Sequence, residues 1–321
     1  MPASFIWIAI FLISLAVLVK GSDYFTDAVE KVGLYFKIPA FIVGVCLLTL
    51  GTTLPEMVSS IFAVINNSSE IAAGTVVGSN ITNIFLILGV AVLFSKEQVE
   101  INYNLLSVDL PLLIGSAFLL SIAAWDGIFT SREAVFFVFL FILYGIYNAS
   151  KEKNRRTKEL GAEVKKEYKK GGGLSRMTFV IMFFSAVLIY FGAKYTIEAV
   201  INLSGIFNIG KDLIATTAVA LGTSLPELFV SISAARKGHA EMAAGNILGA
   251  NMFNTFGVMG IAGLFGQISI GANVLTFGIP MMLIATILYF FITQDKEITK
   301  WEGVILISFY IMFLGKFLNW F

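Results

Sequence analysis

Charged residues and cysteine are both scarce in this chain. Asp, Glu, Lys and Arg together make up 13% of its 321 residues, which is too little polar surface for a soluble domain of that length. The single cysteine, Cys46, permits no internal disulfide and is expected to be a buried small side chain. A net charge of +1 carries no signature of nucleic-acid binding, and we expect no such partner. These shortages exclude a soluble domain and a disulfide framework.

Hydrophobic residues, in contrast, make up 57% of the chain, and its mean hydropathy is +0.86. The apolar runs are about twenty residues long, which is the length that a helix needs to cross the hydrocarbon core and twice what a barrel strand needs. The sequence therefore predicts an all-α integral membrane protein. The first apolar run has no basic residue before it and leads into another, so we expect a membrane helix there and not a cleaved signal peptide.

Ten apolar spans are expected, five on each side of one basic segment. That segment, residues 151–176, holds ten of the 22 Lys and Arg residues, so the positive-inside rule predicts that it is cytoplasmic. An odd number of spans in each half then predicts that both termini face outward. The expected division is a first five-helix repeat (1–150), a cytoplasmic linker (151–175) and a second five-helix repeat (176–321). The expected spans are 4–32, 39–66, 71–95, 104–124, 132–150, 176–203, 210–236, 241–266, 273–293 and 300–320.

One short motif occurs twice. The sequence GTTLPE at 51–56 returns as GTSLPE at 222–227, an offset of 171 residues (222 − 51). The same offset maps GSNITN at 78–83 onto GANMFN at 249–254. Because each half contains an odd number of spans, the second half must enter the membrane from the opposite side. Inverted-topology repeats of this kind are typical of alternating-access transporters, and a channel does not need them.

Each motif contains a proline inside an apolar run. Proline removes a backbone donor and crowds the carbonyl one turn earlier, so we expect the helices to break near 50–55 and near 221–226. Broken helices are tolerated in hydrocarbon only where the freed carbonyls face protein or a cavity. The sequence therefore predicts broken helices, with exposed carbonyl oxygens, at the membrane midplane.

The motifs also carry one carboxylate each, Glu56 and Glu227. A charge at the midplane costs about 2.5–3.5 kcal/mol on insertion scales, and neither motif contains a lysine or arginine to compensate it. The missing positive charge is best supplied by a bound cation. Further oxygens stand beside the carboxylates in hydroxyl and amide side chains: Thr52, Thr53, Thr223, Ser224, Asn83 and Asn254. Asn80 and Asn251 are interpreted as hydrogen-bonding residues between helices.

These ligands are all hard oxygens, which suit Ca²⁺, Na⁺ or Mn²⁺ and argue against Zn²⁺ or copper, since no cysteine or histidine lies near the motifs. Ca²⁺ accepts about six to eight oxygens in flexible geometry. Two carboxylates neutralise one Ca²⁺, and Na⁺ is nearly the same size with half the charge. We therefore expect Ca²⁺ and Na⁺ as transported ions and no cofactor.

At these residues the chain resembles the sodium/calcium exchanger family, within the wider cation/calcium antiporter superfamily. The resemblance lies in G-T-[ST]-x-P-E in each half, followed by G-S-N or G-A-N and then Asn. It implies an electrochemically driven Na⁺/Ca²⁺ antiporter of the plasma or inner membrane, and not an enzyme. The short central segment has no room for the calcium-sensing domains of animal exchangers, so we expect a minimal prokaryote-type exchanger. No protein partner is inferred beyond the ions and the bilayer.

The resemblance also implies a ligand set. In that family the central Ca²⁺ is held by the two motif glutamates, here Glu56 and Glu227, and by backbone carbonyls that fall on Thr52 and Thr223. Sodium subsites flank it. Carbonyls at Thr49 and Ala220 and side chains at Thr53, Ser79, Asn83 and Ser224 correspond to those subsites, and Asn254 is expected to be a further or shared ligand.

Two positions depart from the family pattern. Ala250 stands where many relatives have a serine that binds Na⁺, and Asn254 stands where the potassium-dependent branch has aspartate, which disfavours potassium coupling. The G-N-x-x-E-H motif of proton-coupled calcium exchangers is absent. The resemblance favours an electrogenic exchange of three Na⁺ per Ca²⁺, and two for one stays open. Ca²⁺/H⁺ or Mn²⁺/Na⁺ exchange on the same scaffold are the alternatives, followed by a cation channel or a calcium sensor.

Overall fold

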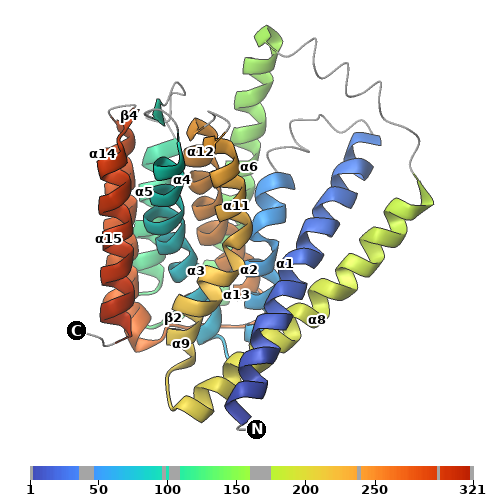
Figure 1. The fold of residues 1–321 in the computed structure, drawn as a ribbon, viewed down its shortest axis with the longest axis vertical. Coiled ribbons are helices and arrows are strands. Elements are labelled where there is room, and N and C mark those ends of the chain that lie inside the picture. Colours follow the sequence, from blue (N-terminus) through green and yellow to red (C-terminus); the bar gives the residue numbers. More distant parts are fainter. Residues whose placement is uncertain are drawn as a thin grey trace.

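The computed structural model describes residues 3–35, 47–95, 99–100, 109–159, 175–236, 240–294 and 297–318, and these are almost all helical (Figure 1). Within those ranges, five segments are long and apolar enough to cross a membrane by length and composition. They are Ser4–Phe25, Glu70–Phe94, Arg176–Phe207, Lys211–Ile232 and Val274–Gln294. The prediction of an all-α membrane protein is confirmed, while the count of ten spans and the inverted repeat stay predictions. Cys46 lies outside the described residues.

Two long outer helices, α1 (Ala3–Tyr35) and α8 (Arg176–Phe207), pack against each other beside the remaining helices (Figure 1). Glycine allows the close approach, because a Cβ on Gly21 would lie 3.0 Å from Leu188 Cβ and one on Gly192 would lie 2.8 Å from Leu18 Cα. Gly21 and Gly192 are related by the offset of 171 residues. The outward faces of both helices expose large apolar side chains, as a lipid-facing helix does.

The centre of the molecule is built from helices of both halves. In the first half they are α2 (Leu47–Ile65), α3 (Glu70–Ile81), η2 (Thr82–Leu88) and α4 (Gly89–Phe94). In the second half they are α9 (Lys211–Ile214), η3 (Ala215–Val219), α10 (Ala220–Thr223), α11 (Leu225–Arg236), α12 (Ala240–Met252), η4 (Phe253–Val258) and α13 (Met259–Gly263). Every residue of α3 after Glu70 is buried. A Cβ on Gly78 would collide with the carbonyl oxygen of Thr216, so the backbones of α3 and η3 touch there.

Further helices and two short strand pairs complete the fold. The helices are α5 (Asp109–Ala123), α6 (Ser131–Glu159), η5 (Val274–Gly278), α14 (Ile279–Gln294) and α15 (Lys300–Phe317). Strand β1 (Val99–Glu100) pairs antiparallel with β4 (Glu297–Ile298), and β2 (Ile128–Phe129) pairs antiparallel with β3 (Ile268–Ser269). Helix α6 continues to Glu159, into the segment expected to be a linker.

The first half of the chain starts on one side of the molecule and ends on the other, and the second half runs back in the opposite direction (Figure 1). The end of α6 and the start of α8 lie in the upper half of Figure 1, whereas the start of α1 and the end of α15 lie in the lower half. The strand β4 lies in the upper part and β2 in the lower part. Each half therefore begins on one side and ends on the other.

The predicted break in the first motif is wrong. Helix α2 runs from Leu47 to Ile65 with Pro55 inside it. A proline removes only one intrahelical hydrogen bond, and neighbouring helices stabilise a helix that continues past it, whereas a full break exposes several backbone groups. In the second motif the helix is interrupted at one residue, because α10 ends at Thr223 and α11 begins at Leu225, with Ser224 between them at φ −83° and ψ 7°. Backbone hydrogen bonds still run from Ser224 to the Ala220 carbonyl and from Leu228 to the Ser224 carbonyl, each at 3.1 Å, so the interruption is a local distortion and the expected full break is not seen.

In the described ranges the structure contains four π-helical segments, which were not predicted from the sequence. Two of them, η2 starting at Thr82 and η4 starting at Phe253, are separated by the repeat offset (253 − 82 = 171). They contain Asn83 and Asn254, two of the predicted ligands. A π-helical turn is often found at a functional site, since it turns a side chain to a direction that a regular helix cannot give it.

Candidate ion-binding site

The two motifs meet in the buried centre of the molecule. Glu56 on α2 and Glu227 on α11 are both completely buried. Ser224, from the second motif, donates a hydrogen bond of 3.3 Å to Glu56 Oε1, and Ser79 lies 3.5 Å from the same oxygen. Thr223 also lies beside Glu56, and Thr52 of the first motif lies beside Glu227 of the second, so each carboxylate has neighbours from the other half. One site therefore draws on both motifs.

Several buried oxygens of this site have no hydrogen-bond partner among the residues that the structure describes. They are Oε2 of Glu56, both carboxylate oxygens of Glu227, and the amide oxygens of Asn83 and Asn254. The ion pairs found among the described residues, Lys20 with Asp23 and Lys211 with Glu70, do not involve these groups. Burying a carboxylate without a partner is costly. The arrangement is one that a bound cation stabilises.

The other predicted ligands lie in the same buried region. Thr52, Thr53, Ser79, Asn83, Ala220, Thr223, Ser224 and Asn254 are all buried. Thr49 lies in the first turn of α2, and its side chain is outside the described part of the structure. Hydrogen bonds link Glu56 to Ser79 and Ser224, and Thr223 and Thr52 lie beside Glu56 and Glu227 respectively. These contacts do not join Asn254 or Ala220 to either carboxylate.

Two of these groups are already engaged in the structure. The Thr223 hydroxyl donates its hydrogen to the carbonyl oxygen of Val219 at 3.0 Å, which fixes the direction of the hydroxyl while its oxygen can still accept or bind an ion. The carbonyl of Ala220 accepts from the Ser224 backbone at 3.1 Å and lies 3.4 Å from the Thr223 hydroxyl. An ion at Ala220 must share this oxygen with those donors.

No group of three or more His, Cys, Asp or Glu side chains occurs among the described residues. A site with two carboxylates must therefore be completed by neutral oxygens from hydroxyls, amides and the backbone. Such a donor set suits Ca²⁺ and Na⁺, which prefer hard oxygen ligands in flexible geometry.

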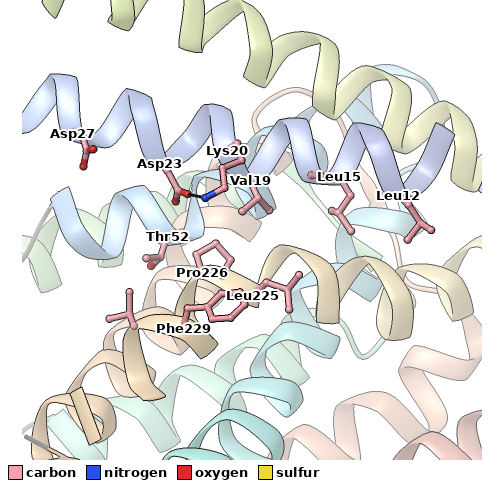
Figure 2. A pocket seen from close by; sticks show the side chains of 12 residues that line it. Leu12, Leu15, Val19, Lys20, Asp23, Asp27, Thr52, Leu225, Pro226 and Phe229 are labelled. Carbon is pink, nitrogen blue, oxygen red and sulfur yellow. Dashed lines mark hydrogen bonds and ion pairs between the residues drawn. The ribbon is translucent and has the colours of Figure 1, made fainter. Parts of the chain in front are cut away.

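A cavity of about 710 Å³ leads to the motifs. It lies between α1, α2 and α11, and it ends on Thr52 and Pro226 (Figure 2). Asp23, Asp27 and Lys20 stand at one end of it and Leu12 at the other, with Lys20 Nζ 3.1 Å from Asp23 Oδ2 (Figure 2). Sequence analysis missed this cavity, although charged residues inside the first apolar span were the available signal.

The sequence has a matching family. The family model described as sodium/calcium exchanger protein matches residues 6–149 and 177–318, which is most of the chain. The chain belongs to the sodium/calcium exchanger family. Its resemblance to that family is thereby confirmed, and cation/calcium exchange across a membrane is its general activity.

Individual relatives agree with this membership of the exchanger family. The sodium/calcium exchanger MaX1 of Methanosarcina acetivorans is 36% identical in an alignment 340 positions long, gaps included, which covers 95% of this chain and 96% of that protein. The inner membrane protein YrbG of Escherichia coli is 29% identical and the alignment covers 97% and 94% of the two chains. These are membrane proteins of similar length to this chain.

Solved structures of the sodium-calcium exchanger NCX_Mj are similar in fold. One, soaked with 100 mM Na⁺ and 10 mM Sr²⁺, has a TM-score of 0.65 and 25% sequence identity, and the match covers 96% of this chain and 97% of that one. Another, soaked with 10 mM Na⁺ and no Ca²⁺, gives the same TM-score and identity. The fold of this exchanger is therefore that of NCX_Mj along nearly its whole length.

Proposed function

We propose that this protein is a secondary active antiporter that exchanges Na⁺ for Ca²⁺ by alternating access. The observation that carries the proposal is the set of buried oxygens without hydrogen-bond partners on Glu56, Glu227, Asn83 and Asn254. The name of MaX1 and an NCX_Mj structure soaked with 2.5 mM Na⁺ and 0.1 mM Ca²⁺ support the same two ions.

In this proposal Ca²⁺ is held by the side chains of Glu56 and Glu227 and by the backbone carbonyls of Thr52 and Thr223. Two carboxylates balance the charge of one Ca²⁺, so the occupied site is neutral. Sodium occupies flanking positions whose ligands come from Thr49, Thr53, Ser79, Asn83, Ala220, Ser224 and Asn254. Na⁺ and Ca²⁺ compete because the negative charge of the same two glutamates attracts both ions into one cavity.

Alternating access requires two halves that can exchange their conformations around one site. The division into repeats at 1–150 and 176–321 is supported by features that return at one offset: the motifs, the glycines at 21 and 192, and the segments η2 and η4. The strand pairs at opposite ends of the molecule fit a second half that is inverted relative to the first (Figure 1). The cavity beside α1 serves as the ion path on one side in the conformation described.

Flux measurements test this function. Proteoliposomes containing the full chain should accumulate ⁴⁵Ca²⁺ when loaded with Na⁺ and diluted into Na⁺-free buffer at equal pH on both sides. A pH gradient without Na⁺ should drive little uptake. Uptake driven by the pH gradient alone would assign the protein to Ca²⁺/H⁺ exchange instead.

The proposed topology places both termini outside the cell and the basic segment in the cytoplasm, in the plasma or inner membrane. A cysteine introduced at Ser4 or at Asn319, each in a background without Cys46, should react with a membrane-impermeant thiol reagent added to intact cells. A cysteine at Glu159 should react only after the cells are opened. Labelling of Ser4 and Asn319 from opposite sides would contradict the inverted repeat.

A further inference from the structure

Four asparagines lie between the α3–η2 segment and the α12–η4 segment. Asn80 and Asn83 belong to the first half, and Asn251 and Asn254 stand at the corresponding positions of the second half, 171 residues later. All four are buried. Asn83 and Asn254 are predicted ion ligands, whereas Asn80 and Asn251 are not. The hydrogen bonds of the four residues indicate what Asn80 and Asn251 do.

Asn83 is held by Asn251. The Asn83 Nδ2 group donates to Asn251 Oδ1 at 2.9 Å, and Asn251 Nδ2 donates in turn to the backbone carbonyl of Asn80 at 3.3 Å. An amide that donates through its nitrogen turns its oxygen to the other side. The Asn83 Oδ1 atom is buried and has no hydrogen-bond partner, so it is free to bind an ion. A flipped Asn83 would set two amide oxygens against each other and lose this ligand.

The corresponding bond of the other half is not formed. By the repeat offset, the counterpart of the Asn83–Asn251 bond joins Asn254 Nδ2 to Asn80 Oδ1. Both of these atoms are buried and without a hydrogen-bond partner. Asn80 Nδ2 instead donates to Thr255 Oγ1 at 3.0 Å and lies 3.6 Å from Met282 Sδ. Thr255 is the chain neighbour of Asn254, so Asn80 already lies at that turn of η4.

We propose that Asn251 and Asn80 are positioning residues that act in alternate states of the transport cycle. Asn251 directs the Asn83 oxygen toward the ions in the conformation described, and Asn80 directs the Asn254 oxygen in the state that faces the opposite side. The reason is that the halves of an inverted repeat exchange conformations between the two states. This inference rests on the proposed function, because it assumes that Asn83 and Asn254 bind the transported ions.

The first test is a double-mutant comparison on the full chain. Asn251→Leu removes the orienting acceptor at nearly constant volume, and it should raise the Ca²⁺ concentration for half-maximal ⁴⁵Ca²⁺ uptake about tenfold, as expected for one lost hydrogen bond. In an Asn83→Asp background the same substitution should change that value less than about twofold, because a carboxylate offers an oxygen in either orientation. Asn251→Ala is measured in parallel and tests the same loss if the leucine variant does not fold.

An equal loss in both backgrounds would mean that Asn251 only supports packing, and would overturn the proposal. An unchanged affinity in Asn251→Leu would overturn it as well. Failure of the proposed function is distinguishable, since wild-type vesicles would then show no Na⁺-driven uptake. In that case the affinity of the purified variants for ⁴⁵Ca²⁺ is measured instead of uptake. The effect of Asn251→Leu is again compared between the wild-type and Asn83→Asp backgrounds, and a smaller effect in the second supports the positioning role.

The second test compares Asn251→Leu with Asn80→Leu. The two variants are matched, because Asn80 and Asn251 are both almost completely buried. Half-maximal Ca²⁺ concentrations are measured in everted and in right-side-out membrane vesicles, so that each face of the protein is assayed. Asn251→Leu should raise the value at one face and Asn80→Leu at the other. Equal effects of each variant at both faces would contradict the alternation of the two bonds.

Discussion

Glu227→Gln is expected to reduce Na⁺-driven Ca²⁺ uptake below detection, and Glu56→Gln is expected to do the same. Glutamine keeps the size of the side chain and removes its charge, so the helices can pack as before. Both glutamates are completely buried, and in the proposed site the lost charge is one that balances a divalent ion. Breaking a buried ion pair by neutralising one partner costs about 3–5 kcal/mol, which is more than about a hundredfold in affinity.

Glu227 is the more informative of the two substitutions. Both of its carboxylate oxygens lack a hydrogen-bond partner, whereas Glu56 Oε1 receives bonds from Ser79 and Ser224. Glu227 therefore depends more on the ion for its stabilisation. We expect Glu227→Gln to leave the folded protein at least as stable as the wild type in the absence of ions, since a neutral amide is less costly to bury than a charge.

Glu70→Gln is the matched control. Glu70 undergoes the same chemical change but lies at a partly exposed position, paired with Lys211 at 3.3 Å. Partly exposed ion pairs contribute little, so its uptake should stay close to that of the wild type. Wild-type uptake by a folded Glu227→Gln variant would disprove the site assignment.

Membrane voltage is expected to change the final Ca²⁺ accumulation strongly. Glu56 and Glu227 give the empty site a charge of −2, so it is neutral with one Ca²⁺ and carries +1 with three Na⁺. An exchange of three Na⁺ for one Ca²⁺ therefore moves one net charge. Voltage contributes about 2.3 kcal/mol per charge per 100 mV, which corresponds to about a 50-fold shift in the Ca²⁺ ratio.

The number of Na⁺ ions bound depends on the residue at position 250. Ser79 contacts Glu56, and its counterpart in the second half is Ala250, which is buried and has no hydroxyl to offer Glu227. The loss of that oxygen weakens one expected Na⁺ position. The carbonyl of Ala220 and a water can complete the position, and on that basis we expect three Na⁺ to bind.

The measurement uses proteoliposomes with a fixed Na⁺ gradient and an imposed potassium diffusion potential. The final ⁴⁵Ca²⁺ accumulation should follow the potential in the wild type. If accumulation is the same at every potential, exchange is two for one, and Ala250→Ser is then the substitution that should introduce voltage dependence. Ser308→Ala, on the exposed face of α15, serves as a control that should leave the response unchanged.

The fold class and the two glutamates could be predicted because they depend on strong local signals. Long apolar runs permit only membrane helices, and a carboxylate inside such a run needs a partner. The hydrogen bonds from Asn80 and Asn251 across the two halves were also predictable, since amides buried in hydrocarbon must find partners. The offset of 171 residues then identified the corresponding residues of the two halves from the sequence alone.

Other features depend on packing that the sequence does not display. Proline predicted a break in both motifs, yet only the helix around Ser224 is interrupted, because neighbouring helices decide whether a missing hydrogen bond bends or ends a helix. The π-helical turns at Asn83 and Asn254 have no local sequence signal. The cavity beside Lys20 is lined by α1, α2 and α11 together, and its shape depends on how these helices pack.

Equilibrium binding tests most directly whether one shared site serves both ions. Purified wild-type protein should bind about one ⁴⁵Ca²⁺ per chain, as the charge of two carboxylates implies, and Na⁺ should displace it with a Hill coefficient above one. The Glu56→Gln/Glu227→Gln double variant should bind none. Calcium binding that Na⁺ does not displace, or that survives in the double variant, would contradict a single shared site formed by the two motifs.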